Sequence, residues 1–232
     1  MTTQGPRGCT TFSRRGGAVE LPLFPLSTVL YPGLPIPLHV FEERYREMFG
    51  RVLEGGRRFG VVAIVHGHEV GGSAVYHPVG CVAEVREVRR HPDGRLDVVA
   101  RGERRFRIEG VTQAAPYIVA SVATLGEATG ESATERILPA ARLFNRYVAT
   151  LLEIAGEDEI EQVDLPDDPV TASYLVAAGL QVDLADKQHL LAIPSAAERL
   201  RAEAALLRRE LALLDHLGIA GPARLTVSFS LN

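Results

Sequence analysis

Lysine is almost missing from this chain, although phosphate binding in P-loops and hydrolysis by serine–lysine pairs depend on it. The 232 residues contain 25 lysines and arginines, and only Lys187 is a lysine. A phosphate-binding P-loop needs a lysine followed by serine or threonine after a glycine-rich turn, but Lys187 is flanked by Asp186 and Gln188. A serine–lysine hydrolase needs a serine held beside the lysine, and no nucleophile elbow or glycine-rich turn stands there. The sequence therefore predicts no catalytic residues, no ATPase and no peptidase.

Histidines near the middle of the first half are the only cluster with metal-ligand chemistry. His66, His68 and Glu69 lie on one segment, and His77 follows it. Two imidazoles and a carboxylate are ligands that zinc accepts. Alternate residues on a glycine-rich loop rarely converge on one ion, so a polar surface loop is the favoured interpretation. We predict no metal and no cofactor, with zinc at this loop as the alternative.

Arginine is concentrated between residues 84 and 107. The segment holds eight arginines and five interleaved acids, a pattern typical of ion pairs between neighbouring strands on an exposed sheet face. The alternative is a basic patch for an acidic peptide or RNA, formed by Arg86, Arg89, Arg90, Arg104 and Arg105. Few aromatic residues accompany these arginines, which weakens a stacking platform for single strands. Nucleic acid is therefore not the favoured partner.

Charge divides the chain near residue 125. Residues 1–125 carry 16 basic and 12 acidic residues, and residues 126–232 carry 9 and 17, for a total of −4. This balance gives no overall attraction to nucleic acid or to an anionic membrane. The hydrophobic fraction of 46% is ordinary for a globular protein. We expect a tail without fixed structure at 1–18, a β-rich subdomain at 19–125, a helical subdomain at 126–218 and a C-terminal tail at 219–232.

The first half is patterned as strands with one helix. Apolar residues between 41 and 53 recur at three- and four-residue steps, which predicts a helix ended by Gly55 and Gly56. About six strands are expected around it, from a proline-broken first strand at 20–26 to a last one at 117–125. Residues 96–100 and 106–111 are expected as separate strands. Short turns between strands favour a small closed or half-closed barrel.

The second half is patterned as helices. Asp168 before Pro169 and Asp183 are suited to cap helices. Ser195 and Glu198 have the spacing of a capping box. Apolar residues from 200 to 214 then recur at a period near 3.5, which favours packing within the chain, with a partner helix as the alternative.

Few features direct the chain to a membrane or an oxidising compartment. Cys9 and Cys81 are too few for a disulfide framework and suggest reduced thiols. The first 18 residues hold no apolar core of a secretory signal, and no run approaches the roughly 18 apolar residues of a membrane span. We predict a cytoplasmic protein without a membrane partner.

Several motifs carry a resemblance to a known family. They are LPLFPL at 21–26, VLYPG at 29–33, FEERY at 41–45, VGCVAEV at 79–85 and GERRFRI at 102–108. Their order and spacing resemble the N-terminal substrate-binding domain of Lon proteases. In the helical half, DKQHLL at 186–191 and ERL at 198–200 resemble the segment that closes this domain. The resemblance extends from about residue 20 to 215.

This resemblance implies an α+β fold, a PUA-like pseudo-barrel with an inserted helix followed by an α-helical bundle. It also implies recognition of protein substrates. The chain stops where the ATPase of the family would begin, so we expect a standalone bacterial copy and carry no proteolysis over.

The favoured function is a non-catalytic module that binds unfolded or peptide segments of other proteins. Apolar loops fixed by proline and open strand edges are features that bind extended chains. The candidate contact residues are Leu30, Tyr31, Pro32, Leu34, Ile36 and Phe41, for several of which a place in the core is the competing interpretation. An RNA- or nucleotide-binding module and an adaptor for a separate ATPase or protease are the alternatives.

Overall fold

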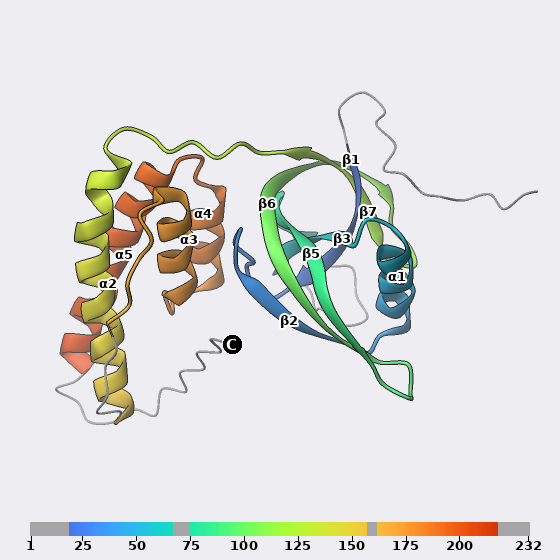
Figure 1. The fold of residues 1–232 in the computed structure, drawn as a ribbon, viewed down its shortest axis with the longest axis horizontal. Helices are drawn as coiled ribbons and strands as arrows, with labels where there is room; N and C mark the ends of the chain where they lie inside the picture. The colour runs from blue at the N-terminus through green and yellow to red at the C-terminus, as the bar shows by residue number, and fades with distance from the viewer. Residues whose placement is uncertain (1–18, 67–74, 157–161, 218–232) are drawn as a thin grey trace, which may run out of the picture. The chain divides into compact units, whose positions relative to one another are not determined.

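The computed structural model describes residues 19–66, 75–156 and 162–217. Those residues form an α+β fold of seven strands and five helices (Figure 1), which confirms the predicted fold class. The strands are β1 (Val19–Leu26), β2 (Pro35–Val40), β3 (Arg58–His66), β4 (Val75–Tyr76), β5 (Val79–Arg90), β6 (Leu96–Gln113) and β7 (Ile118–Thr124). The helices are α1 (Glu43–Glu54), α2 (Ala133–Ala155), α3 (Pro169–Gly179), α4 (Leu184–Ala192) and α5 (Ala196–Leu217).

Five of the strands close into a ring. They pair in the order β1, β7, β6, β5 and β3, and a parallel pairing of β3 with β1 completes the circle. β2 adds to β6 and β4 adds to β3 outside this ring. β1 closes the ring by pairing with β7 over its first five residues and with β3 over its last four. Of the closed and half-closed barrels expected from the sequence, the structure has the closed one.

One strand is longer than the sequence indicated. Residues 96–100 and 106–111 belong to a single strand of 18 residues, β6. Its register shifts opposite Val82 and Ala83, and again near Gly110. Extra residues at such bulges bend a strand and increase its twist. The bend lets β6 pair with β2, β5 and β7 in turn.

Two apolar clusters use alternate residues of the ring strands. One cluster draws side chains from all five ring strands and contains Phe106, which is fully buried. Gly60 and Gly80 leave room for the aromatic ring of Phe106, because a Cβ at either position would lie within 2.8 Å of that side chain. The other cluster packs α1 and β2 against the ring and includes Phe24, whose ring lies 4.4 Å from that of Tyr45.

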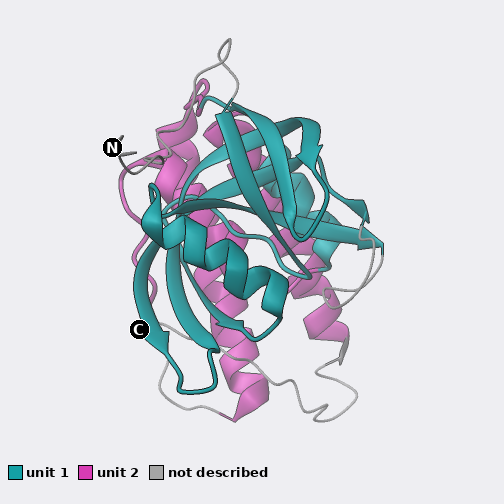
Figure 2. Cartoon of the chain, turned by 90° about the vertical axis from the view of Figure 1, so that its right-hand side faces the viewer, with its two compact units in different colours: residues 1–126, 183–192 teal, residues 127–182, 193–232 magenta. Residues whose placement is uncertain are grey.

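The chain divides into two compact units, shown in teal and magenta in Figure 2. Unit 1 is residues 1–126 with 183–192, and unit 2 is residues 127–182 with 193–232. The sequence-based boundary near 125 is therefore incomplete, because α4 belongs with the strands. Within unit 1, the Gln188 side chain donates to the Val79 carbonyl at 2.9 Å, and the Tyr31 hydroxyl donates to the Lys187 carbonyl at 2.9 Å. The single lysine thus lies on a helix that packs on the barrel.

Helices α2, α3 and α5 form the described part of unit 2. Asp168 caps α3 by accepting from the Thr171 amide at 2.9 Å, as its place before a proline predicted. Ser195 accepts from the Glu198 amide at 3.3 Å and donates to the Glu198 carboxylate at 3.0 Å. The apolar stripe of α5 is buried from Leu200 to Leu214. These contacts agree with the expected capping residues and with packing of the stripe within the chain.

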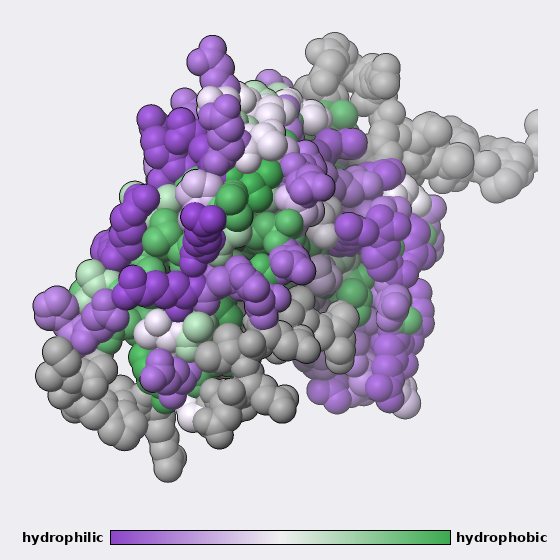
Figure 3. All heavy atoms as spheres, turned by 60° about the vertical axis from the view of Figure 1, so that its left-hand side comes forward, coloured by the Kyte–Doolittle hydropathy of each residue, from purple (hydrophilic) through white to green (hydrophobic). Residues whose placement is uncertain are grey.

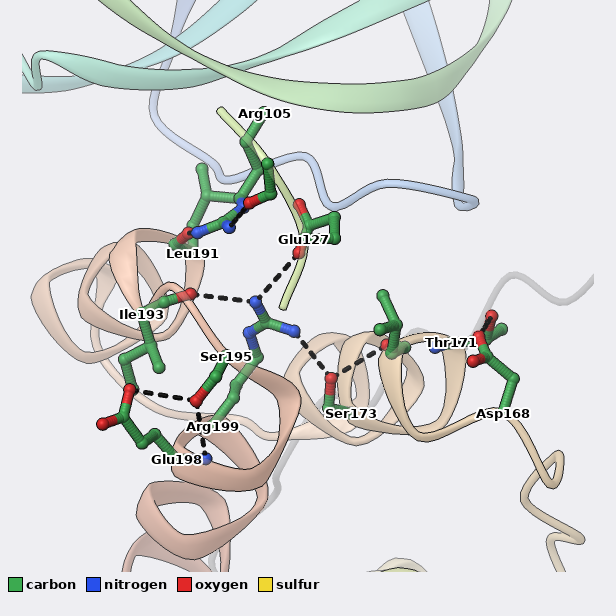
Figure 4. Close-up of polar contacts among 12 residues, drawn as sticks. Arg105, Glu127, Asp168, Thr171, Ser173, Leu191, Ile193, Ser195, Glu198 and Arg199 are labelled. Atoms are coloured by element: carbon green, nitrogen blue, oxygen red, sulfur yellow. Dashed lines mark hydrogen bonds and ion pairs between the residues drawn. The ribbon is translucent and has the colours of Figure 1, made fainter. Parts of the chain in front are cut away.

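A buried arginine joins the elements of unit 2. Arg199 has no exposed surface, and Figure 4 shows its guanidinium between α3 and the segment before α5. It donates to the Ser173 hydroxyl at 2.7 Å and to the Ile193 carbonyl at 2.9 Å. Glu127 lies 3.5 Å away, and the Tyr174 ring lies 3.9 Å beneath the guanidinium. Most of its donors are therefore used inside the unit.

A buried glutamate follows one turn later on α5. Glu203 is fully buried, and neither carboxylate oxygen has a hydrogen-bond partner in the described part of the chain. Burial raises the pKa of the Glu203 carboxyl well above its ordinary value, and the charge of Arg199 offsets this only in part. A neutral carboxylic acid is therefore favoured at this position in the folded protein.

Some expectations lie outside the described residues. These are the tails at 1–18 and 219–232, Cys9, and His68 with Glu69 of the histidine segment. Across the described ranges, no helix is long and apolar enough to cross a membrane.

Candidate functional site

The predicted peptide-binding residues differ in exposure. Leu30, Tyr31 and Ile36 are core residues, exposed by 3%, 2% and 9%. This corrects the prediction that they form a contact surface. Pro32 and Leu34 are half-buried. Among these candidates, Phe41 alone is exposed, with half of its surface open to solvent.

Backbone pairing explains why the loop before β2 is buried. The Gly33 amide donates to the Gly102 carbonyl at 2.8 Å, and the Gly102 amide donates to the Leu34 carbonyl at 2.9 Å. These bonds hold the loop on β6. The loop lies so close that a Cβ at position 102 would meet the Tyr31 carbonyl oxygen at 2.3 Å. The prolines here shape a packed segment instead of an open loop.

The candidate basic patch is also divided. Arg86, Arg89, Arg90 and Arg104 are exposed, and Arg86 pairs with Glu84 at 2.7 Å. The prediction that Arg105 belongs to a surface patch is wrong, because only 1% of this residue is exposed. Its guanidinium donates to the Leu191 carbonyl at 3.0 Å and to the Gly126 carbonyl at 2.7 Å (Figure 4). It therefore holds α4 and the end of the barrel segment together and is not a surface charge.

Ion pairing accounts for further charges on the same sheet. Arg58 and Glu103 form two hydrogen bonds of 2.7 and 2.8 Å. This contact lowers the pKa of the Glu103 carboxyl and raises that of Arg58. Paired charges on neighbouring strands favour the interpretation of this segment as a solvated sheet face over a nucleic-acid surface.

An open groove lies on the outer face of β2, β6 and β5, which run side by side in Figure 1. We call it the β2–β6–β5 groove. It has a volume of about 390 Å³. The strand register places His39 opposite Asp97 and Asp97 opposite Arg89, and the next row is Pro37, Val99 and Glu87. The first row is therefore entirely polar. The second row has the apolar Val99 at its centre, between Pro37 and Glu87.

A carboxylate shared by two histidines forms one end of this groove. Asp97 lies 2.7 Å from Nδ1 of His39 and 2.6 Å from Nε2 of His91. Hydrogen bonds from His39 and then from His91 lower the pKa of the Asp97 carboxyl. The Phe41 ring stacks on His39, with ring centres 6.1 Å apart. The polar cluster thus fixes the orientation of an exposed aromatic ring beside the groove.

The free edge of β2 is poorly suited to strand addition. Leu34 faces β6 through its carbonyl, and alternate residues of a strand face opposite sides. Pro35, Pro37 and His39 therefore point their backbones away from β6, and the two prolines have no N–H to donate. At this edge, which the sequence analysis expected to be open, two of the three outward-facing residues therefore cannot donate a hydrogen bond to an added strand. The sheet face is the better surface for a ligand.

The histidine segment does not form a metal site in the described residues. His66 is exposed at the end of β3, and burial lowers the pKa of the His77 imidazole. No group of three or more histidine, cysteine, aspartate or glutamate side chains is placed to hold a metal across the described ranges.

Exposed large apolar side chains occur elsewhere as well. Val111 on β6 and Leu138 on α2 are exposed by 49% and 60%. Figure 3 shows hydrophobic residues in patches bordered by hydrophilic ones on one face of the molecule. What distinguishes Phe41 and Val99 is their place at a groove with polar groups.

Residues 20–209 match the family model of the ATP-dependent protease La (LON) substrate-binding domain. The chain is 28% identical over 193 residues to a Lon protease of Flavobacterium johnsoniae, covering 78% of this chain and 23% of that protein. It is 27% identical over 206 residues to the Lon protease of Escherichia coli K12, covering 87% of this chain and 26% of that protein. The chain thus spans about a quarter of the length of these relatives.

Solved structures agree with the sequence comparison. A Lon N-terminal domain protein from Xanthomonas campestris matches with a TM-score of 0.58 and 25% identity, over 80% of this chain and 97% of that one. The N-terminal domain of the Mycobacterium avium complex Lon protease matches with a TM-score of 0.61 and 18% identity, over 82% and 98% of the two chains. The second similarity concerns the fold alone.

Proposed function

Because the chain belongs to the LON substrate-binding domain family, we propose that it binds segments of other proteins without reacting with them. The β2–β6–β5 groove is the proposed contact surface. The observation that carries this choice is the exposed Phe41 and Val99 beside a groove lined by polar side chains. A bound segment lies on the sheet face, since the prolines block the β2 edge.

The groove offers both kinds of contact that an extended peptide needs. Burying an exposed apolar side chain contributes roughly 1.5–3 kcal/mol when burial is complete. Phe41 is half exposed and Val99 is exposed by 36%, so each gains part of that amount. Arg89 and Glu87 can bond to peptide carbonyl and amide groups. Such contacts are independent of the order of side chains, which suits a binder of many unfolded segments.

A role without catalysis is supported by the part of the family that matches. The match is to a domain described by substrate binding, and the motifs of a P-loop and a serine–lysine pair are missing from the sequence. The proteolysis of the longer relatives is therefore left out of the proposal. A separate protease or ATPase that receives the bound segment is the proposed partner. Cytoplasm is the proposed location, in accord with the buried thiol of Cys81.

Nucleic acid is a weaker candidate. Arg105 is buried and Arg86 is paired with an acid. The remaining exposed arginines of the patch are too few to give the strong salt-dependent attraction of a nucleic-acid surface.

We expect the double variant Phe41→Ser/Val99→Ser to bind an unfolded polypeptide about tenfold more weakly, which corresponds to about 1.4 kcal/mol. Both side chains are exposed, so the fold should be retained. The measurement is fluorescence anisotropy with a reduced, alkylated and labelled polypeptide. Val111→Ser is the matched control, because Val111 is also exposed on β6 but lies outside the groove, whereas Val99 lines it and Phe41 stacks on His39, which lines it. An equal loss of affinity in the control and in the double variant would rule out the groove as the binding surface.

A further inference from the structure

A second groove lies within unit 2, between α2 and α5, and shares no residue with the β2–β6–β5 groove. Its volume is about 380 Å³. Arg136 on α2 and Arg201 and Arg208 on α5 line it, above a floor of Ala140, Leu200 and Ala204. We call this larger groove the α2–α5 groove. A smaller hollow of about 290 Å³ adjoins it and is lined by Arg136 and Arg201 together with Glu131 and Glu198.

The arginines of this groove are available to a ligand. Arg136, Arg201 and Arg208 are all exposed. Within residues 19–66, 75–156 and 162–217, none of the three has an ion pair, and Arg208 bonds only to the Ala204 carbonyl of its own helix at 3.2 Å. Three other arginines of unit 2 are paired with acids: Arg146, Arg199 and Arg209. Arg142, which lies outside the groove, has no ion pair among the described residues. The groove therefore collects charges that the unit does not use internally.

Positive charge in this groove contrasts with the rest of unit 2. The residues of this unit include 8 arginines and 15 acids. Three of those arginines line the α2–α5 groove, together with a single acid, Glu135. A local excess of positive charge on an acidic unit favours a short anionic ligand, since a long polyanion would meet the surrounding acids.

The wall and floor of the groove add further requirements. Ala140 and Leu200 are each exposed by only 1%, so the floor is apolar and shallow. Pro139 lies inside α2 and lines the groove.

We propose that the α2–α5 groove binds a short acidic segment of a partner protein. Guanidinium groups form paired hydrogen bonds with carboxylates, and the apolar floor accepts the methylene groups of glutamate or one apolar side chain. The groove therefore recognises an acidic peptide by its charge and by contact with the apolar floor.

The test uses the full chain and a labelled six-residue peptide with four glutamates around a central leucine. Fluorescence anisotropy should detect binding that weakens as salt is raised. Arg136→Gln/Arg201→Gln should weaken binding about fivefold, since each exposed ion pair contributes roughly 0.2–1 kcal/mol. Arg142→Gln is the matched control, because Arg142 is exposed on the same helix and does not line the groove. Circular dichroism checks that each variant is folded.

Three results would overturn the proposal. The first is equal affinity of the double variant and the wild type, or no binding by the wild type. The second is equal binding of a peptide in which glutamine replaces every glutamate. The third is tighter binding of a single-stranded RNA of the same charge, which would assign the groove to nucleic acid. The Phe41→Ser/Val99→Ser variant should bind the acidic peptide normally, so this test is independent of the β2–β6–β5 groove.

Discussion

Replacing Arg199 with methionine is expected to lower the free energy of unfolding by about 3–5 kcal/mol, the range for breaking a buried ionic contact by removing one partner. The substitution removes the donors to Ser173 and Ile193 and the contact with the Tyr174 ring. It also removes the positive charge nearest Glu203. Methionine fills much of the same volume, so the loss comes from unpaired polar groups more than from a cavity.

The measurement is urea unfolding followed by circular dichroism. Arg209→Met is the matched control on the same helix. Arg209 is half exposed and pairs with Glu210 at 2.8 Å, and such surface pairs contribute about 0–1 kcal/mol. A loss of similar size in the two variants would show that the buried network does not carry the stability of this unit.

Replacing Glu203 with glutamine is expected to stabilise the protein at neutral pH by about 1–3 kcal/mol, because each unit by which the folded-state pKa is raised costs about 1.4 kcal/mol at high pH and glutamine does not ionise. The pKa of the Glu203 carboxyl is raised in the folded state above its ordinary value of 4.5. The folded protein therefore holds this proton more tightly than the unfolded chain does. Wild-type stability from this group is present below about pH 4.5 and is lost as the pH rises through the folded-state pKa.

The difference between variant and wild type is the informative quantity. It should be near zero at pH 4.5 and should grow as the pH rises, because glutamine does not ionise. Unfolding free energies at a series of pH values measure it. Glu203→Asp keeps a carboxyl group and should keep the pH dependence, whatever it loses in packing. A difference between Glu203→Gln and wild type that is constant with pH would contradict the buried neutral acid.

Local rules predicted most elements of the fold. The three- and four-residue steps between residues 45 and 53 gave the helix now seen as α1, although Phe41, the first residue of that pattern, lies before the helix and is exposed. Asp168 and Ser195 cap the helices that they were expected to cap. Such features depend on neighbours within a few residues in sequence. The family motifs extended this agreement to the barrel, whose closure by β1 and β3 has no local signature.

Features set by distant contacts were not predicted. The density of arginines around it placed Arg105 in a candidate surface patch, but Arg105 is bonded to Leu191 of α4, 86 residues later in the chain. Tyr31 has the turn signals of an exposed loop, yet Gly33 and Gly102 fasten that loop to β6. In both cases, an element remote in sequence decides the burial of the residue.

The candidate site was predicted in part for the same reason. Phe41 was expected to be a contact residue and is exposed, whereas Val99 and the pair of His39 with Asp97 were missed. Cross-strand pairs depend on register, and the register of β2 with β6 joins residues 58 positions apart. The one signal in the sequence was the alternation of apolar residues in β2, which indicates that His39 lies on the exposed face of that strand.

Photo-cross-linking from the β2–β6–β5 groove can show directly whether protein segments bind there. A benzoylphenylalanine cross-linker in place of Phe41 is compared with the same group in place of Val111 or Leu138, which are also exposed. With a labelled unfolded polypeptide, we expect a cross-link from position 41 that excess unlabelled polypeptide removes, and little cross-linking from the other two positions. Strong cross-linking from position 111 or 138 without any from position 41 would contradict the proposal that the β2–β6–β5 groove binds protein segments.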